Sequence, residues 1–319
     1  MTTLLIALKA DALSLADRAT IAQLAPEMQL LVTDDRGAIE AALDEIEIVA
    51  GGIASELIVK APRLRWYQQW GAGADWLLRH PEAGQRDFVL TNASVVHAIP
   101  ISEHILAFML AFARRLPEAI RSQTRREWQR EGRPFFELAG KTIVIVGLGA
   151  IGARTAEIAA GLGMRVLGVR RDPTLKPPGV AEMLGPDRLH EALPQADFVV
   201  LTVPLTPATG RMIGEAELRL MKPSAYLVNI GRGKTVDETA LARALREKWI
   251  AGAGLDVFET EPLPADSPLW DMENVIITAH YSGLTPRYTE RAMGIFLDNL
   301  RRYVAGAPLR NVVDRRLGY

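Results

Sequence analysis

The sequence contains no cysteine. This absence excludes a disulfide framework, a thiolate-bound metal and a cysteine nucleophile, and it is compatible with a reducing compartment. Long hydrophobic runs are also missing, because the longest, residues 105–113, falls well short of the roughly 20 residues that a membrane-spanning helix needs. Residues 1–9 lack the basic segment and apolar run of a secretory signal. We therefore expect a cytoplasmic protein without a membrane segment.

The sequence also has almost no excess of charge of one sign. The sequence has 37 lysines and arginines against 38 aspartates and glutamates, and its formal net charge is −1. A nucleic-acid or acidic-membrane partner needs a concentrated basic face. The nearest stretch, residues 121–133, interleaves arginines with Glu127 and Glu131, and we interpret it as the solvated end of a helix. The sequence predicts no nucleic-acid partner, no membrane partner and no metal site.

The chain is long enough for two domains. It has 319 residues, 49% of them hydrophobic and 24% charged, which is typical of globular proteins. In the first part, short apolar segments alternate with helical stretches, and this pattern predicts a parallel sheet covered by helices. The expected strands are residues 4–8, 46–49, 64–68 and 88–91, and the expected helices are residues 12–24 and 38–43.

A long helix, residues 100–128, is predicted next, with an apolar stripe at a spacing of four. From residue 142 onward, six continuous apolar strands are expected, as in a sheet covered on both faces. With right-handed crossovers they form a doubly wound sheet. The strands are residues 142–146, 165–169, 198–203, 225–230, 254–258 and 275–278, with helices at 151–160, 189–193, 215–221 and 238–247. A last amphipathic helix, residues 286–303, is expected to pack on the first domain.

The segment GLGAIG, residues 147–152, follows the strand 142–146 and opens a helix. Alone, this glycine pattern is a weak signal, but in a complete βαβ unit it is a strong one. Gly147 permits a tight turn, Gly149 lets the backbone approach a pyrophosphate, and Gly152 lets the helix pack closely. The N–H groups around Ala150 and Ile151 then hold the phosphates. The alternative is a tight turn that binds no ligand.

The end of the next strand decides which dinucleotide binds. An NAD site places an acidic residue there, about 20 residues beyond the glycines, to bond the ribose 2′-hydroxyl. This sequence has Arg170 and Arg171 instead. A guanidinium cannot accept a hydroxyl proton, whereas it pairs well with a 2′-phosphate. The sequence favours NADP(H) over NAD(H); the alternative is that both arginines are solvated and Asp172 reaches the ribose.

Three polar residues follow three successive predicted strands: Arg232, Glu261 and His280. Parallel strands present their carboxyl ends at one edge of a sheet, which also carries the glycine loop and where such sheets bind ligands. Reduction of a keto acid by hydride creates an oxyanion that must be protonated, and histidine suits that task. A carboxylate on the other ring nitrogen favours the protonated ring. An arginine can polarise the carbonyl and pair with the substrate carboxylate.

Each of these residues taken alone has a non-catalytic explanation. Arginines and glutamates at strand ends are usually solvated, and a histidine at such a position is often a capping residue. Among the other histidines, His97 is the only rival for the acid, because it lies near the expected domain crossing. Their joint arrangement predicts a catalytic site.

Taken together, these segments resemble the D-isomer-specific 2-hydroxyacid dehydrogenase family over essentially the whole chain. The motifs that carry the resemblance are residues 146–152 (VGLGAIG), 203–206 (VPLT), 221–223 (MKP), 229–233 (NIGRG), 252–258 (GAGLDVF), 261–262 (EP) and His280. The resemblance implies that Arg232 binds and polarises the substrate, that Glu261 supports the histidine, and that His280 donates the proton and contacts the substrate.

The resemblance also implies binding residues. Residues 71–75 (GAGAD) match the family loop whose backbone N–H groups, here those of Ala72 and Gly73, hold the substrate carboxylate. Asp256 would contact the nicotinamide carboxamide. Further residues of the matching motifs and strand ends are expected at the cofactor: Val203, Pro204, Ile230, Gly231 and Ser282. The match of residues 95–104 to the family's crossover makes His97 structural.

The implied architecture has two α/β domains. A Rossmann-type doubly wound dinucleotide-binding domain is expected at residues 97–286, and a smaller, discontinuous, flavodoxin-like substrate-binding domain at residues 1–96 and 287–319. A homodimer built on the nucleotide domain is also implied. This sequence departs from the family pattern at Arg170 in place of an acid, at Ala279 where proline is common, and at the bulky Trp70 beside the carboxylate loop.

The leading hypothesis is therefore an NADP(H)-preferring reductase of 2-keto acids, with glyoxylate or hydroxypyruvate as plausible substrates. An alternative from another class is a dinucleotide-sensing, corepressor-like scaffold on the same fold, which should carry partner-binding extensions. Formate or phosphite oxidation would call for other residues around the histidine.

Overall fold

The computed structural model describes residues 2–132 and 134–315 and divides into two compact units. One unit is built from Met1–His97 and Thr285–Tyr319, so that it is discontinuous in sequence. The other unit is the continuous segment Ala98–Leu284. Both are α/β, as predicted.

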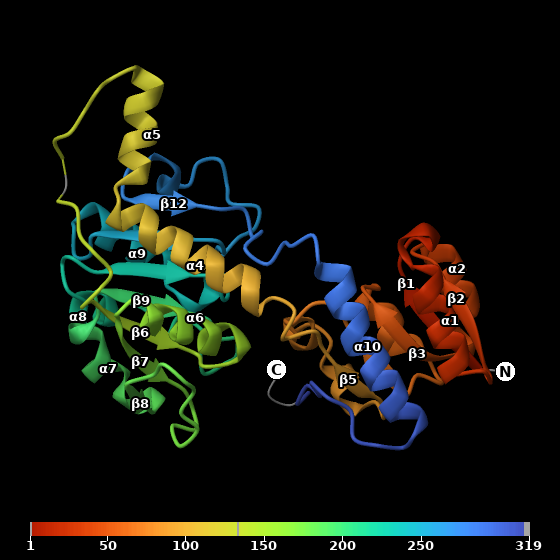
Figure 1. Ribbon diagram of the computed structural model, residues 1–319. Coiled ribbons are helices and arrows are strands. Elements are labelled where there is room, and N and C mark those ends of the chain that lie inside the picture. Colours follow the sequence, from red (N-terminus) through yellow and green to blue (C-terminus); the bar gives the residue numbers. More distant parts are fainter. Residues whose placement is uncertain (1, 133, 316–319) are drawn as a thin grey trace. The chain divides into compact units, whose positions relative to one another are not determined.

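The first unit contains a five-stranded parallel sheet in the order β2-β1-β3-β4-β5 (Figure 1). This is the flavodoxin-like strand order that was predicted. The strands are β1 (Thr2–Ala7), β2 (Met28–Val32), β3 (Ile46–Gly51), β4 (Trp66–Gln68) and β5 (Val89–Thr91). The helices are α1 (Leu15–Leu24), α2 (Arg36–Ala42), α3 (Ser55–Lys60) and α10 (Tyr288–Val304). Single 3₁₀ turns, among them η3 (Asp75–Leu78), complete the connections.

Strand β2 was missed from the sequence. It lies at the edge of the sheet beside β1, and its residues are half-buried or exposed. An edge strand with one neighbour carries a weaker apolar signal than a central strand. The helix expected from residue 12 begins three residues later, where the Ser14 side chain accepts a hydrogen bond from the N–H of Asp17.

Helix α10 belongs to the first unit, although its sequence lies almost 200 residues beyond β5. Trp66 of β4 is fully buried and its ring stacks on Phe296 and on Tyr303, at 5.4 Å between centroids in each case. The prediction that this helix packs on the first domain is confirmed.

The second unit contains a seven-stranded parallel sheet in the order β12-β11-β10-β9-β6-β7-β8 (Figure 1). Counting from β6, the order is that of a doubly wound dinucleotide-binding fold, with one extra strand at the β12 edge. The strands are β6 (Thr142–Val146), β7 (Arg165–Val169), β8 (Glu182–Leu184), β9 (Phe198–Leu201), β10 (Tyr226–Asn229), β11 (Gly252–Leu255) and β12 (Val275–Ile277). The helices are α4 (Ala98–Ala113), α5 (Leu116–Arg125), α6 (Ala150–Gly161), α7 (Leu189–Ala192), α8 (Glu215–Leu220) and α9 (Glu238–Arg246).

The expected count of six strands was wrong because β8 was missed. This strand has three residues, of which only Leu184 is buried, and it forms the sheet edge beside β7. Strands β6 and β7 have the predicted bounds. Strand β11 begins at Gly252 and ends at Leu255, two to three residues before the expected position.

The single long helix predicted over residues 100–128 is also corrected. The chain breaks between α4 and α5, because Arg115 adopts a left-handed conformation with φ = 57°. The Arg115 guanidinium donates to the backbone carbonyls of Arg130 and Glu131, which holds the returning loop against the break. Helix α5 ends at Arg125, and Arg133, the last residue of the basic stretch, lies outside the described residues.

Within residues 2–132 and 134–315, no helix combines the length and the apolar character that crossing a membrane requires.

Candidate active site

The glycine loop between β6 and α6 has the geometry of a phosphate-binding turn. Gly147 has φ = 103°, a conformation that other residues rarely adopt. A Cβ at Gly152 would lie 2.0 Å from the Gly147 carbonyl oxygen, so only glycine lets the helix start this close to the turn. A Cβ at Gly149 would meet nothing within 4 Å, so the backbone there is open to approach. The unpaired N–H groups of the first turn of α6, at Ala150 and Ile151, therefore suit a pyrophosphate.

Arg170 follows β7, and its backbone N–H donates to the carbonyl oxygen of Leu184 at 3.1 Å. Beyond it, the Asp172 side chain is engaged by Thr174, whose backbone N–H donates to Oδ1 at 3.0 Å and whose hydroxyl donates to the same oxygen at 2.5 Å. These hydrogen bonds hold the pKa of Asp172 below its usual range. The Asp172 carboxylate is therefore hydrogen-bonded within its own loop.

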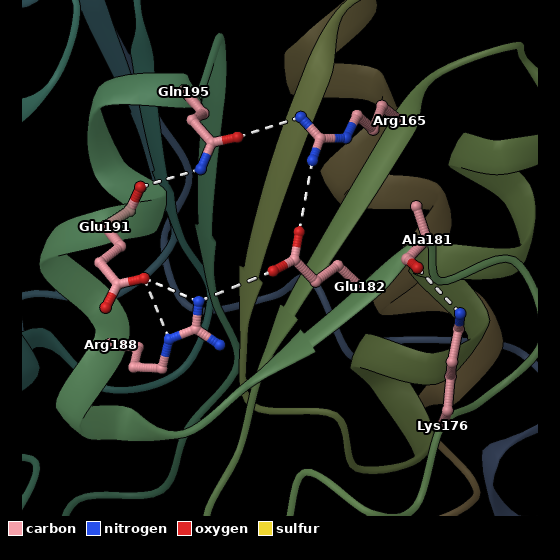
Figure 2. A network of polar contacts seen from close by, with 7 residues as sticks. All are labelled: Arg165, Lys176, Ala181, Glu182, Arg188, Glu191 and Gln195. Carbon is pink, nitrogen blue, oxygen red and sulfur yellow. Dashed lines mark hydrogen bonds and ion pairs between the residues drawn. The ribbon is translucent and has the colours of Figure 1, made fainter.

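Polar contacts fix the connection that leads from Arg170 to the edge strand β8 (Figure 2). Arg165 of β7 pairs with Glu182 of β8 at 3.3 Å, and Arg188 pairs with Glu191 at 2.7 Å. The Lys176 ammonium donates to the Ala181 carbonyl at 2.8 Å and closes the loop. Arg170 and Arg171 belong to the connection between β7 and β8 that these contacts hold.

His280 and Glu261 form a direct pair. The Nδ1 atom of His280 lies 2.7 Å from Oε2 of Glu261, whose other oxygen accepts the backbone N–H of Phe258 at 3.0 Å. The carboxylate is thus held by two contacts, and it fixes the orientation of the imidazole. Because Nδ1 is engaged, Nε2 is the ring nitrogen that can meet a substrate. The imidazole is half exposed, so that it is accessible.

The turn that carries His280 is organised by Asp256, which follows β11 and is fully buried. Its carboxylate accepts the Thr278 hydroxyl at 2.6 Å and the backbone N–H groups of Tyr281 and Ser282 at 3.0 and 3.1 Å. The N–H of His280 donates to the Asp256 backbone carbonyl at 2.9 Å. His280 itself has φ = 51°, a left-handed conformation that is unusual for histidine and that these bonds stabilise.

His104, on α4, extends this network, and sequence reasoning missed it. Its Nε2 lies 3.1 Å from the Thr278 hydroxyl, which in turn donates to Asp256. The ring also packs edge-on against Phe108 and Tyr281. Burial lowers the pKa of His104, although the Asp256 carboxylate acts in the opposite direction. The network therefore links an imidazole, a hydroxyl and a buried carboxylate behind the His280 turn.

Arg232 follows β10 at the same sheet edge as the ends of β11 and β12, since these strands are parallel neighbours. Its Nη1 donates to the Gly231 carbonyl at 2.8 Å, and its own backbone carbonyl accepts the side-chain amide of Asn229 at 3.1 Å. A Cβ at Gly233 would lie 1.9 Å from the carbonyl carbon of Phe258, so this segment packs tightly on the chain leading to Glu261. The expected residues Val203, Pro204, Ile230, Gly231 and Ser282 follow β9, β10 and β12 of this sheet.

In the first unit, residues 71–74 form a loop after β4 that two buried side chains hold. Gln69 donates from Nε2 to the carbonyl oxygens of Gly71 and Gly73 at 3.0 and 2.7 Å. Asn92 donates from Nδ2 to the carbonyl oxygen of Ala72 at 2.9 Å. Sequence reasoning selected the loop and missed both side chains, because the Gln69 bonds depend on the folded shape of the loop and the Asn92 bond joins residues 20 positions apart in sequence.

The remaining candidates have structural surroundings in the same unit. The His97 ring lies 5.3 Å from that of Tyr288, and burial raises the pKa of Tyr288. Trp70 packs edge-on against Phe296 of α10, 6.2 Å between ring centroids.

The family model described as "D-isomer specific 2-hydroxyacid dehydrogenase, NAD binding domain" matches residues 106–282. A glyoxylate reductase of Thermococcus gammatolerans is 43% identical over 280 residues, covering 85% of this chain and 83% of that protein.

Solved structures are similar over the whole length. A D-isomer specific 2-hydroxyacid dehydrogenase from Xanthobacter autotrophicus Py2, in complex with NADPH and MES, has a TM-score of 0.85 at 29% identity and covers 100% of both chains. An NADPH-dependent glyoxylate/hydroxypyruvate reductase from Sinorhizobium meliloti, in complex with NADP and sulfate, has a TM-score of 0.84 at 27% identity, again over 100% of both chains.

Proposed function

This chain belongs to the D-isomer specific 2-hydroxyacid dehydrogenase family, and from that membership we propose that it reduces small 2-keto acids such as glyoxylate or hydroxypyruvate with NADPH. It is an NAD(P)-dependent oxidoreductase that acts on CH–OH groups. The alternative of a dinucleotide-sensing scaffold is not supported by glyoxylate reductase relatives. The observation that carries the proposal is the 2.7 Å pair of His280 and Glu261 beside the glycine-loop edge of the sheet.

The proposed site divides the work among a few side chains. When bound, a reduced nicotinamide supplies a hydride to the keto carbon. His280 gives the proton on Nε2 to the developing alkoxide oxygen, and Glu261 stabilises the imidazolium that donates it. Arg232 polarises the keto oxygen and pairs with the substrate carboxylate. In the first unit, the N–H groups of Ala72 and Gly73 are proposed to bind a substrate carboxylate.

The cofactor is proposed to lie along the edge formed by the loops after β6, β7, β9, β10, β11 and β12. Gly147, Gly149 and Gly152 would hold the pyrophosphate, and Asp256 would accept a hydrogen bond from the nicotinamide carboxamide. The unit Ala98–Leu284 is accordingly proposed as the dinucleotide-binding domain and the discontinuous unit as the substrate-binding domain. The full set of proposed cofactor residues is Gly147, Gly149, Ala150, Ile151, Gly152, Arg170, Arg171, Val203, Pro204, Ile230, Gly231, Asp256 and Ser282.

A substrate panel with both cofactors tests the activity. We expect reduction of glyoxylate or hydroxypyruvate, and His280→Ala should lower kcat by about 10²- to 10⁴-fold, the usual contribution of a positioned acid. His190→Ala, at an exposed histidine paired with Glu217, serves as the control and should keep full activity. The proposal would be contradicted if the wild-type protein oxidised NADPH with none of the 2-keto acids in the panel.

A preference for NADP(H) is supported by two features of the β7 end. Arg170 stands where an NAD site has an acid, and the Asp172 carboxylate is occupied by Thr174, which leaves it poorly placed to bond a ribose hydroxyl. We expect a higher kcat/KM with NADPH than with NADH. Arg170→Asp should shift the ratio toward NADH, whereas Arg246→Asp, the same charge change on α9, should not. A wild-type enzyme that favours NADH tenfold would contradict this preference.

A homodimer through the second unit is supported by an exposed apolar stripe. Leu116 and Ile120 lie one turn apart on α5, and Trp128, just beyond it, is 95% exposed. Two clefts of about 290 and 570 Å³ flank this helix. Ile120→Asp should convert a dimer into a monomer in sedimentation experiments, whereas Leu175→Asp, at another exposed leucine of this unit, should not. A wild-type monomer would overturn the proposed dimer.

We also propose that the enzyme works in the cytoplasm, where NADPH is supplied and where a chain without cysteine needs no oxidising environment. Cell fractionation that finds the activity outside the cytoplasm would contradict this location.

A further inference from the structure

In the loop 71–74, three consecutive backbone carbonyl groups accept hydrogen bonds from side chains. The N–H groups of the same three peptide planes make no hydrogen bond among the described residues. Gln69 bonds the carbonyl oxygens of Gly71 and Gly73, and Asn92 bonds that of Ala72. Among the described residues, no acceptor lies within hydrogen-bond distance of the N–H groups of Ala72, Gly73 or Ala74. The carbonyl groups of the loop are therefore all hydrogen-bonded, whereas its N–H groups are available to a ligand.

Peptide geometry converts this one-sided bonding into a direction. In a trans peptide the N–H points opposite to the C=O of the same plane. The carbonyls of residues 71, 72 and 73 share their planes with the N–H groups of residues 72, 73 and 74. Those of Ala72 and Ala74 must therefore point away from Gln69, and that of Gly73 away from Asn92.

We propose that Gln69 and Asn92 are positioning residues that aim the N–H groups of Ala72 and Gly73 at the substrate carboxylate. The proposal rests on the function proposed above and names residues that would set its preference for an anionic substrate. Neither side chain touches the substrate; each acts through the backbone that it holds.

Both donor side chains are themselves fixed. Gln69 is 5% exposed, and its Oε1 accepts the Trp76 indole N–H at 2.9 Å. Since an indole can only donate, the oxygen of the Gln69 amide must face Trp76, and the amide nitrogen must face the loop. In the same way, the Ser94 backbone N–H donates to Oδ1 of Asn92 and leaves Nδ2 for Ala72. The orientation of both amides is thus dictated by groups that can only donate.

The chemistry explains why amides serve here. A carboxylate at either position would face backbone carbonyls, and a cation would compete with the N–H groups for the substrate. A neutral amide donates to the carbonyls without adding charge. Held in place before the substrate arrives, the N–H groups bind a carboxylate without first reorienting.

The test uses a neutral variant, so that no charge repels the substrate. Gln69→Met keeps the length of the side chain and removes both donors. We expect KM for the 2-keto acid to rise by about 10- to 100-fold, which is the usual effect of losing hydrogen bonds to a charged group. The methyl ester of the same acid, which lacks the charge, should be affected less than about threefold, and KM for NADPH should not change.

Gln68→Met is the matched control, because Gln68 is the neighbouring buried glutamine and bonds Thr91, Asn299 and the Gln69 carbonyl oxygen without reaching a carbonyl of residues 71–73. It should lower stability and leave the acid-to-ester ratio unchanged. If Gln69→Met does not fold, Asn92→Leu tests the same idea through Ala72.

The outcomes separate the two levels of the proposal. A selective loss toward the acid supports it. An active wild type whose Gln69→Met and Asn92→Leu variants keep their KM, or lose acid and ester equally, overturns the positioning role and leaves the proposed function intact. A wild type that reduces no 2-keto acid overturns both.

Discussion

The buried carboxylate of Asp256 determines the conformation of the turn that carries His280, the proposed acid. Asp256 is removed from water, yet it receives one hydroxyl and two backbone N–H groups from residues 278–282. A buried charge is tolerable only when such donors surround it. The same bonds keep His280 in a left-handed conformation, so strain at the proposed catalytic position is balanced by hydrogen bonds of Thr278, Tyr281 and Ser282.

His104 gives this network a pH dependence. Its folded-state pKa is lowered, mainly by burial, with Asp256 and Tyr281 as the titratable groups that face it. The unfolded chain therefore binds a proton more readily than the folded protein does. Stability should be fully present above the ordinary histidine pKa of about 6.5 and should fall as the pH drops through and below that value.

The prediction is measured by urea unfolding between pH 5 and 8. His104→Gln, which cannot titrate, should flatten the decline of the unfolding free energy below pH 6.5. His80→Gln, at a partly exposed histidine of the other unit, should leave it unchanged. An identical pH slope in wild type and His104→Gln would show that the burial of His104 does not contribute.

At the level of secondary elements, the sequence identified those whose signal is local. Strands β6 and β7 are continuous apolar runs, and the glycine loop has a steric requirement at Gly147 and Gly152 that only glycine meets. The edge strands β2 and β8 were missed because half-buried strands carry little pattern. The α4–α5 break had a local sign in Pro117, which disfavours a continuous helix, but the left-handed turn itself depends on contacts of Arg115 with the returning loop.

The proposed catalytic pair was selected from residue type and strand position, and the loop that offers Ala72 and Gly73 was selected from the family resemblance. Asn92 and His104 were not, since they contact residues that are distant in sequence, and Gln69 was not, since its bonds to Gly71 and Gly73 depend on the folded shape of the loop. Such contacts follow from tertiary packing, which a single sequence does not display.

Helix α10 is tied to the sheet of its unit by a buried amide. Asn299 is fully buried; its Nδ2 donates to Gln68 at 3.1 Å and to the Arg310 carbonyl at 3.0 Å, and its Oδ1 accepts the Arg310 N–H at 2.8 Å. Asn299→Ala leaves the Arg310 N–H without its acceptor and opens a small cavity.

We expect Asn299→Ala to lower the unfolding free energy by about 2–4 kcal/mol, since buried polar groups that lose their partners are destabilising. Asp298→Ala, at the adjacent and exposed position of α10, should change it by less than about 1 kcal/mol, because its ion pairs are on the surface. Urea denaturation compares the two. Equal losses would mean that the buried amide makes no special contribution.

For the whole molecule, the division into two units separates the proposed cofactor residues from the proposed carboxylate loop. Every proposed cofactor residue lies within Ala98–Leu284, whereas the carboxylate loop and its two positioning amides lie within Met1–His97. A change confined to the first unit, such as Asn299→Ala, should therefore leave the Kd for NADPH within about twofold of the wild-type value.

The same division predicts where bound cofactor adds stability. At 100 times its Kd, a ligand that binds only the folded state raises the unfolding free energy by about 2.7 kcal/mol. Hydrogen exchange read out by mass spectrometry can assign that gain to segments. NADPH should slow global opening in peptides from β6 to β12, and Asn299→Ala should accelerate it in peptides from β1 to β5 without reversing the NADPH effect. If NADPH slowed exchange in β1 to β5 as strongly as in β6 to β12, the units would unfold as one cooperative body, and substrate-side and cofactor-side mutations could no longer be interpreted separately.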